Sequence, residues 1–272
     1  MEKSTLGAGG DIGAGRSVGT GRTMPAPIAV LFDLDDTLIA FDAVSEQAWQ
    51  QVIATHAVRT NVNATALRNA INEHSTWYWS DPVRHRIGRH SLPQTRRTLV
   101  QQALQKLGHD DAAVAHAIAD DYTALRTKLM HLLPGTETLL TGLQQRGVRM
   151  GLVTNGTTEE QRHKIERFAL APYFEFIQVE GELGVGKPED AAYQHALARL
   201  DLPPEAVWFV GDNLEWDVLA PQRHGMTGVW VDRKRQGHAT AIGQHPPGPR
   251  HDIPRHQIEH THQLPVLFLP TV

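Results

Sequence analysis

The sequence contains no cysteine among its 272 residues. This excludes disulfide bonds, thiolate nucleophiles and cysteine-based zinc or iron–sulfur sites, and it leads us to expect a cytoplasmic protein. An excess of basic charge is also missing, because the formal net charge is −4 at pH 7. The composition therefore favours neither nucleic acid nor an anionic membrane as a partner. No apolar run approaches the roughly 18 residues that a transmembrane helix requires.

Residues 1–24 are rich in glycine and contain no continuous apolar stretch. Seven glycines fall within the first 21 residues, but no strand precedes them, so a dinucleotide-binding fingerprint is not indicated. The apolar stretch of a secretory signal is missing as well. We expect a flexible tail here.

Short segments rich in valine, isoleucine, leucine and phenylalanine alternate with helical patterns along much of the chain. This alternation predicts a doubly wound α/β fold, with a parallel sheet of strand order 3-2-1-4-5 and helices on both faces. The expected strands are 28–32, 149–153, 175–179, 207–210 and 228–231, and the expected core helices are 136–146, 159–170 and 190–200. A loop rich in histidine and proline is expected at 236–250, followed by a last short strand and helix.

One interval interrupts this alternation after the first strand. From Phe41 to about His131 the apolar spacing is helical, and no convincing strand occurs. We therefore expect an inserted α-helical cap over residues 42–131. The α/β core would consist of residues 25–41 plus 132–272. The expected cap helices are 45–59, 64–79, 92–107 and 112–132.

Polar side chains gather where the expected strands end. In open parallel sheets, ligands bind at the carboxyl ends of the strands, so these side chains are expected to meet at one edge. Lys187 lies in a loop before a helix and could join them. The residues at the strand ends are Asp33, Asp35, Asp36 and Thr37 after the first strand, Thr154 and Asn155 at the second, and Asp212 and Asp217 after the fourth.

Several carboxylates tolerate one another when a divalent cation lies between them. Ligands that are all oxygen favour a hard ion, and Mg²⁺ is the usual choice when a phosphate completes its coordination. A hydroxyl, a lysine and a helix N-terminus suit phosphate oxygens. A carboxylate aimed at such a phosphate can act as a nucleophile through an aspartyl-phosphate.

Four short motifs in this sequence together resemble those of a known protein family. They are DLDDT at 33–37, an apolar strand ending in TNG at 154–156, GKPE at 186–189 and VGDNLEWD at 210–217. In this order and at these strand ends they resemble the motifs of the haloacid dehalogenase superfamily of phosphotransferases. The resemblance covers about residues 25–41 and 132–235. A helical insert between the first two motifs is similar to the caps of the common phosphatase branch.

The resemblance implies a Mg²⁺-dependent phosphomonoesterase that acts on a small phosphorylated metabolite. Asp33 would be the nucleophile, and Asp35 would protonate the leaving alcohol and then activate water. Lys187 would neutralise Asp33 and the phosphate. The implied phosphate-binding residues are Thr154, Asn155 and Lys187; the implied Mg²⁺ ligands are Asp33, Asp212 and the backbone carbonyl of Asp35; Asp217 would assist through water or by holding Lys187.

Other functions stay open at this stage. A phosphomutase would use the same residues and return the phosphoryl group to a sugar. A 2-haloacid dehalogenase needs no metal and typically lacks the second aspartate, so Asp35 argues against it. Phosphonate cleavage needs a cap lysine, and only Lys106 and Lys128 are available in the cap. A non-catalytic binding protein would be expected to have lost one of the charged residues.

The cap contains WYW at 77–79 followed by several arginines. In one interpretation Arg84, Arg86 or Arg89 binds an anionic part of the substrate, while the aromatic rings stack on a sugar or base of the substrate. In the other, which we favour, the arginines form a solvated basic turn beside the cap core. The sequence leaves the organic part of the substrate and the oligomeric state open.

Overall fold

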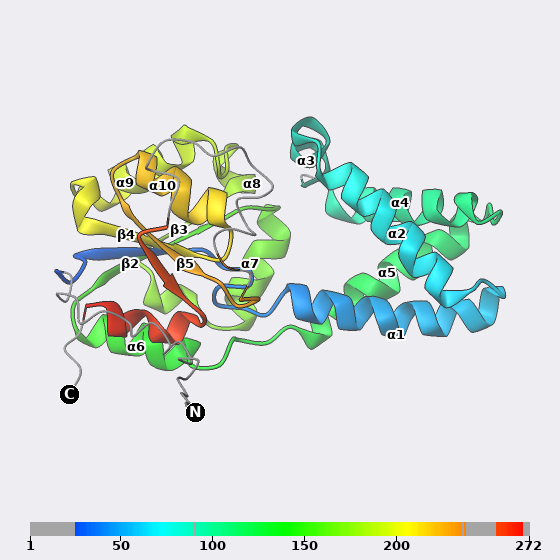
Figure 1. Ribbon diagram of the computed structural model, residues 1–272, viewed down its shortest axis with the longest axis horizontal. Helices are drawn as coiled ribbons and strands as arrows, with labels where there is room; N and C mark the ends of the chain where they lie inside the picture. Colours follow the sequence, from blue (N-terminus) through cyan, green and yellow to red (C-terminus); the bar gives the residue numbers. More distant parts are fainter. Residues whose placement is uncertain (1–24, 90, 236, 238–253, 269–272) are drawn as a thin grey trace, which may run out of the picture.

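The computed structural model describes residues 25–89, 91–235, 237 and 254–268. The expected tail at 1–24 and all of the expected loop at 236–250 except Gly237 lie outside these ranges. Figure 1 shows an α/β core beside a group of helices, with the two parts joined at the end of α1 nearer the sheet. None of the helices in the described ranges combines the length and the hydrophobicity that a membrane crossing requires.

The core is built on a sheet of six strands in the order β3-β2-β1-β4-β5-β6. Every neighbouring pair is parallel. The predicted order 3-2-1-4-5 is confirmed, and the predicted last strand is β6 at the edge beside β5. The strands are β1 (Ala29–Phe32), β2 (Arg149–Thr154), β3 (Phe176–Val179), β4 (Val207–Gly211), β5 (Thr227–Val231) and β6 (His256–Ile258).

Helices cover both faces of the sheet because successive side chains of a strand point to opposite sides. Val30 and Phe32 of β1 belong to one apolar cluster, which includes side chains of α6 (Thr136–Gln145) and α7 (Thr158–Arg167). Ala29 and Leu31 belong to another cluster, with α9 (Asp190–Leu200) and α10 (Ala220–Arg223). The remaining elements are α8 (Glu180–Leu183), 3-10 helices at Ala171–Tyr173, Pro204–Ala206 and Thr261–Leu267, and a π-helix at Leu214–Leu219.

Between β1 and α6, where an insertion was predicted, the described residues form five helices. They enclose their own apolar cluster, in which the Trp49 and Tyr122 rings stack with their centroids 3.8 Å apart. Asn63 caps one helix through Ala66 N, as expected of a short polar residue at that position. The helices are α1 (Asp42–Thr60), α2 (Ala64–Trp79), α3 (Pro82–Arg89), α4 (Leu92–Lys106) and α5 (Ala112–Leu129).

Helix α3 replaces the basic turn that the sequence indicated. Asp81 precedes it, and the Oδ1 atom of Asp81 accepts a hydrogen bond of 2.8 Å from Arg84 N. Pro82 occupies the first helical position, where a missing N–H costs nothing. An acid-plus-proline start therefore outweighs the turn tendency of the segment.

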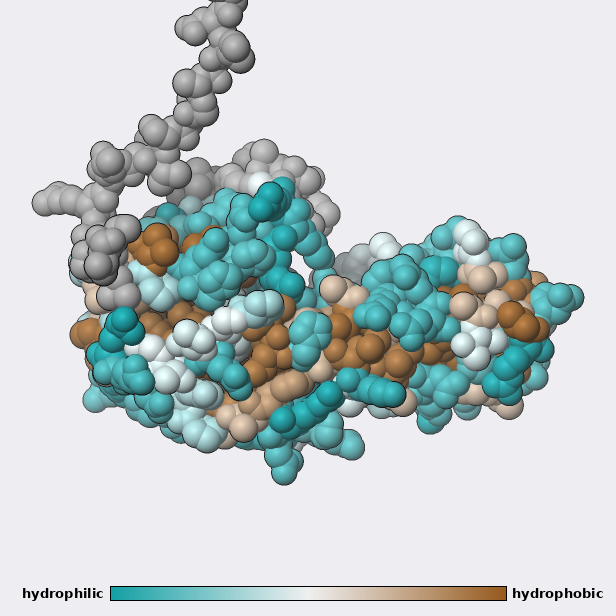
Figure 2. Space-filling model, turned by 90° about the horizontal axis from the view of Figure 1, so that it is seen from below, coloured by the Kyte–Doolittle hydropathy of each residue, from teal (hydrophilic) through white to brown (hydrophobic). Residues whose placement is uncertain are grey.

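Two crossings connect the helical insertion to the core, and they pair with each other. Ala40 N donates to His131 O (2.9 Å), and Leu133 N donates to Leu38 O (2.8 Å). Ile39 and Leu132 form an antiparallel bridge between them. Seen from below, the core and the helical part are two lobes with apolar residues visible where they meet (Figure 2). The only covalent links between the lobes are thus held side by side.

Candidate active site

The carboxyl ends of β1 and β4 bring three aspartates together. Asp33 follows β1, and its N–H continues the pairing by donating to Val210 O at 3.0 Å. Asp212 follows β4, the neighbouring strand. Oxygen atoms of Asp33, Asp212 and Asp217 all lie within 4.8 Å of one another. The parallel sheet therefore juxtaposes residues that are almost 180 positions apart in sequence, as the strand-end argument predicted.

Lys187 reaches into this cluster from the loop before α9. Its Nζ atom lies 2.7 Å from Asp33 Oδ1 and 2.7 Å from Asp217 Oδ1, and its side chain is 2% exposed. Asn155, after β2, fixes the lysine backbone in both directions. Its Nδ2 donates to Lys187 O (2.6 Å), and its Oδ1 accepts from Lys187 N (2.8 Å). Asn155 thus ties the loop after β2 to the lysine.

Burial and mutual repulsion dominate the electrostatics of the cluster. Burial raises the pKa of Asp33 to about 7, although the ammonium of Lys187 opposes this shift. Burial and then the charge of Asp33 raise the pKa of Asp212 well above its usual range. Burial lowers the pKa of Lys187, but Asp217 and Asp33 outweigh it, so the lysine stays protonated. Three carboxylates therefore face a single ammonium, an imbalance that a divalent cation would correct.

The hydrogen bonds show which oxygens are left for such a cation. Both oxygens of Asp217 are engaged, Oδ1 by Lys187 and Oδ2 by Asn213 N at 3.0 Å. Within the described residues, Oδ2 of Asp33 has only a long contact of 3.4 Å with the Thr37 hydroxyl. The donor set fits a hard cation held by Asp33 and Asp212, with Asp217 holding the lysine.

Asp35 lies outside this cluster and has its own cation. Lys164 Nζ contacts its two carboxylate oxygens at 2.9 and 2.7 Å, and Gln161 Nε2 lies 3.2 Å from Oδ2. Both partners come from α7, the helix that follows β2. Gln161 also contacts the Thr154 hydroxyl at 2.5 Å. One amide therefore links the predicted acid–base residue to the predicted phosphate-binding threonine.

Asp36 serves the backbone. Its Oδ1 accepts from Phe41 N at 3.0 Å, and both of its oxygens accept from Asp42 N at 3.1 and 2.9 Å. Arg233 Nη1 is 3.2 Å from Oδ1. The carboxylate thus caps the start of α1 and joins the loop after β1, residues 33–37, to the first crossing into the helical insertion.

A cavity of about 390 Å³ lies between the helical insertion and the core. From the core it is lined by the loop after β1, the loop after β2 and α7; from the insertion it is lined by α1, α2, α4 and α5. Asp35 and Asn155 line its core side, so the cavity adjoins the predicted catalytic residues. Its polar and aromatic lining includes Trp49, Trp79, Arg96, Tyr122, Arg126 and Lys164.

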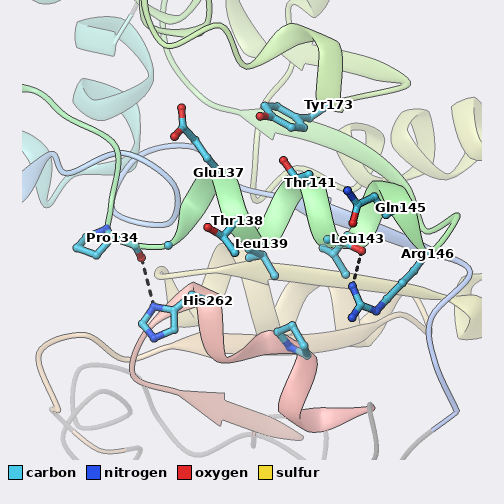
Figure 3. Close-up of a pocket in the computed structure, with 13 residues that line it drawn as sticks. Pro134, Glu137, Thr138, Leu139, Thr141, Leu143, Gln145, Arg146, Tyr173 and His262 are labelled. Carbon is cyan, nitrogen blue, oxygen red and sulfur yellow. Dashed lines mark hydrogen bonds between the residues drawn. The ribbon is translucent and has the colours of Figure 1, made fainter.

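A second cavity, of about 1080 Å³, lies elsewhere in the core. It is formed by α6 and the C-terminal 3-10 helix, and Figure 3 shows His262 bonded to the Pro134 carbonyl at its rim (3.2 Å). Glu137 and Arg146 also line it, and the Arg146 guanidinium bonds to the Gly142 carbonyl at 2.7 Å. No residue of the aspartate cluster lines this groove, so it is separate from the candidate active site.

The three arginines singled out from the sequence remain predictions for substrate binding. The Arg84 guanidinium lies 4.0 Å from the centre of the Trp77 ring and donates to Trp77 O at 2.6 Å. Arg86 is exposed, and the side chain of Arg89 lies outside the described part of the structure. Neither Arg84 nor Arg86 is among the residues that line the cavity.

Four residues near the cavity were not found from the sequence. Gln161 and Lys164 lie three positions apart on α7, so one helix face carries both toward Asp35. That spacing can be read from the sequence, but polar side chains three positions apart are common on any surface helix. Arg96 and Arg126 come from α4 and α5, and only the packing of those helices brings them into one cavity.

Comparisons with known proteins agree with this geometry. The haloacid dehalogenase-like hydrolase family matches residues 29–225. A phosphoserine phosphatase from Thermus thermophilus is 29% identical over 224 residues, which cover 75% of this chain and 88% of that protein. A glyceraldehyde 3-phosphate phosphatase from Methanopyrus kandleri is 29% identical over 212 residues, which cover 75% of this chain and 84% of that protein.

A solved structure shares the fold. The magnesium-bound HAD-hydrolase YfnB from Bacillus subtilis superposes with a TM-score of 0.67 at 20% identity, covering 91% of this chain and all of that one. The family match spans well over half of the chain and contains the aspartate cluster, the lysine loop and the helical insertion. The chain belongs to the family of haloacid dehalogenase-like hydrolases.

Proposed function

We propose that the protein is a Mg²⁺-dependent phosphomonoesterase that acts through an aspartyl-phosphate. The observation that carries this proposal is that two neighbouring aspartates, Asp33 and Asp35, have different surroundings. Asp33 is buried against Lys187 and beside Asp212, where a nucleophile and a cation would be held. Asp35, two residues on, borders the cavity that would hold the rest of the substrate. Phosphatases among the relatives support the same reading.

The proposed reaction has two displacements at phosphorus. An Asp33 oxygen attacks the phosphorus atom while the bond to the ester oxygen breaks, and Asp35 gives its proton to that leaving oxygen. Water then attacks the same phosphorus atom and gives a proton to Asp35 as the bond to Asp33 breaks. Inorganic phosphate leaves, and both aspartates return to their starting states.

The surrounding residues would stabilise charge during both steps. The ammonium of Lys187 neutralises Asp33 and the phosphoryl oxygens, while Thr154 and Asn155 line the phosphate side. Lys164 and Gln161 hold the Asp35 carboxylate in position. A bound Mg²⁺ supplies positive charge against the phosphoryl oxygens as charge develops on them.

We propose that residues 42–131 act as the cap of this enzyme and residues 25–41 plus 132–272 as its core. The cap closes one side of the cavity with aromatic side chains, including Trp49 and Tyr122. Excluding water there would strengthen every charge interaction at the phosphate.

We expect the protein to hydrolyse an aryl phosphate in the presence of Mg²⁺. The rate of hydrolysis should fall about 10³-fold in EDTA, because the cation supplies several kcal/mol of charge stabilisation. Activity should return when Mg²⁺ is added in excess. The measurement is release of the aryl alcohol with and without EDTA. Halide release from a 2-haloacid in EDTA would instead identify a dehalogenase, and a requirement for a sugar bisphosphate would identify a mutase.

Mg²⁺ binding should weaken as the pH falls. The pKa of Asp33 in the metal-free protein is raised to about 7 by burial, so below that pH the cation must displace a proton. For one proton released, the Mg²⁺ dissociation constant should be about tenfold larger at pH 6 than at pH 8. Isothermal titration calorimetry at several pH values measures this, and a dissociation constant independent of pH would contradict it.

A further inference from the structure

The cavity between cap and core carries more positive charge than its own carboxylates neutralise. The charged side chains that line it are Arg96, Arg126, Lys164, Asp35 and Glu160. Lys164 and Asp35 pair with each other at 2.7 Å. Among the described lining residues, this leaves Glu160 as the single carboxylate available to the two arginines.

Arg126 is buried without enough acceptors. Its side chain is 4% exposed, and its one hydrogen bond within the described residues goes to Glu160 Oε1 at 3.4 Å. Its buried Nε has no hydrogen-bond partner, although a guanidinium has five donors. The rings of Phe41 and Tyr122 lie 4.8 and 5.6 Å from its central carbon. These rings stabilise the cation, but they leave N–H groups free for a ligand.

Arg96 lies on the neighbouring helix and is also short of negative charge. Its Nη1 donates to the Thr123 hydroxyl at 2.5 Å, and the Tyr122 ring lies 5.1 Å from its central carbon. No carboxylate of the described residues forms an ion pair with it within 4.0 Å. Burial and then the like charge of Arg126 lower the pKa of Arg96 to about 10. The two guanidiniums therefore repel each other in the absence of an anion.

Other arginines of the protein show how a purely structural arginine is paired in this fold. Arg97, the next residue on α4, forms a two-pronged pair with Asp120 at 2.9 and 2.8 Å. Arg149 does the same with Glu175, and Arg162 with Glu182. These exposed arginines have full carboxylate partners, while the two in the cavity do not. The contrast points to an anion supplied from outside the chain.

We propose that Arg126 and Arg96 bind a second anionic group of the substrate, remote from the ester that is hydrolysed. This inference rests on the proposed phosphatase function and narrows its substrates to phosphorylated compounds with a further carboxylate or phosphate. Asp35 and Asn155 line the same cavity from the core side. One end of such a substrate would meet the loop after β1 while the other meets the arginines in the cap, with Trp49 and Trp79 along the cavity wall.

The test uses substrates that differ only in their far end. Carboxyalkyl phosphates and alkanediol bisphosphates of increasing length are compared with alkyl phosphates of the same length. The measured quantity is the preference, defined as kcat/KM for the anionic substrate divided by kcat/KM for the neutral one. The wild-type protein should prefer at least one anionic series by more than tenfold, and which series it prefers identifies the group as carboxylate or phosphate.

Arg126→Met should lower this preference about 30-fold, because a charge-assisted hydrogen bond to a buried ion is lost. Arg96→Met should lower it as well. The matched control is Arg97→Met, which removes a neighbouring arginine outside the cavity and should change the preference by less than twofold. Methionine fills the space of the arginine stem, and a thermal melt of each variant checks the fold. A wild-type protein without preference, or an unchanged preference in both cavity variants, would overturn the inference.

A binding measurement separates this inference from the phosphatase proposal. Succinate and the neutral succinamide are titrated against the protein while the fluorescence of its tryptophans is followed, since Trp49 and Trp79 line the cavity. Succinate should bind at least tenfold more weakly to Arg126→Met than to the wild type, and succinamide should show no such difference. If succinate binding depends on Arg126 but the protein has no phosphatase activity, the proposed function is refuted and the inference about the arginines stands. Phosphatase activity with equal succinate binding in both proteins would refute the inference alone.

Discussion

Asp33→Asn is expected to lower kcat for an aryl phosphate by about 10⁴-fold or more, because an amide oxygen cannot form the aspartyl-phosphate. The substitution preserves the shape of a residue that is only 8% exposed. It also removes a negative charge from a crowded cluster, so the fold should persist. Steady-state kinetics with saturating Mg²⁺ measures the effect, and Asp110→Asn, at an exposed position of the cap, is the matched control.

Chemical quenching distinguishes the nucleophile from its neighbour. With a substrate labelled in its phosphate, Asp35→Asn should accumulate acid-stable label on the protein, because water is no longer activated to attack the intermediate. Asp33→Asn should accumulate none. Full activity in Asp33→Asn, or label trapped on that variant, would show that another residue is the nucleophile.

Lys187→Met is expected to lower kcat by about 10³-fold and to destabilise the metal-free protein by about 3–5 kcal/mol at pH 8. The lysine is 2% exposed and is the partner of two carboxylates. Removing it leaves Asp33, Asp212 and Asp217 facing one another without compensation. Urea unfolding with and without Mg²⁺ measures the loss, and Lys106→Met, which removes an exposed lysine paired with Glu73, is the control.

The pH dependence of this loss has a definite sign. The pKa of Asp33 is already raised to about 7 in the folded protein, and losing the lysine would raise it further. A carboxyl whose pKa is higher folded than unfolded contributes stability at low pH, and that stability disappears as the pH rises through the folded pKa. The deficit of Lys187→Met relative to the wild type should therefore be smaller at pH 6 than at pH 8. A deficit that grows toward low pH would contradict the charge argument.

The sheet and the strand-end residues were predictable because a parallel sheet leaves little freedom. Alternating apolar strands and helices allow few topologies, and the carboxyl ends of neighbouring strands must meet. Residues such as Asp33 and Asp212 therefore come together whatever the details of the loops. The bounds of a helix could also be predicted where residues that favour helix ends, such as glycine, flank it. The helix over Asp190–Leu200 agrees with its expected bounds, and after α6 Gly147 takes a positive φ of 73°, as glycines at helix ends often do.

The cap cavity was not predictable for the opposite reason. Arg96 and Arg126 lie 30 positions apart on two helices, and no local pattern says which faces of those helices meet. The arginine-rich segment around Arg84 was more conspicuous in the sequence, yet α3 lies at one end of the cap and the Arg84 guanidinium stacks on Trp77. Specificity in such a cavity depends on packing between helices, which a single sequence constrains weakly.

The paired crossings between core and cap have a mechanical consequence. A single linker would let the cap swivel freely, whereas two chain segments held by the Ala40–His131 and Leu133–Leu38 hydrogen bonds resist torsion. We therefore expect the cap to move mainly by bending across these two paired segments. Since Asp36 accepts hydrogen bonds from the backbone at the same place, such bending would pull directly on the loop that carries Asp33.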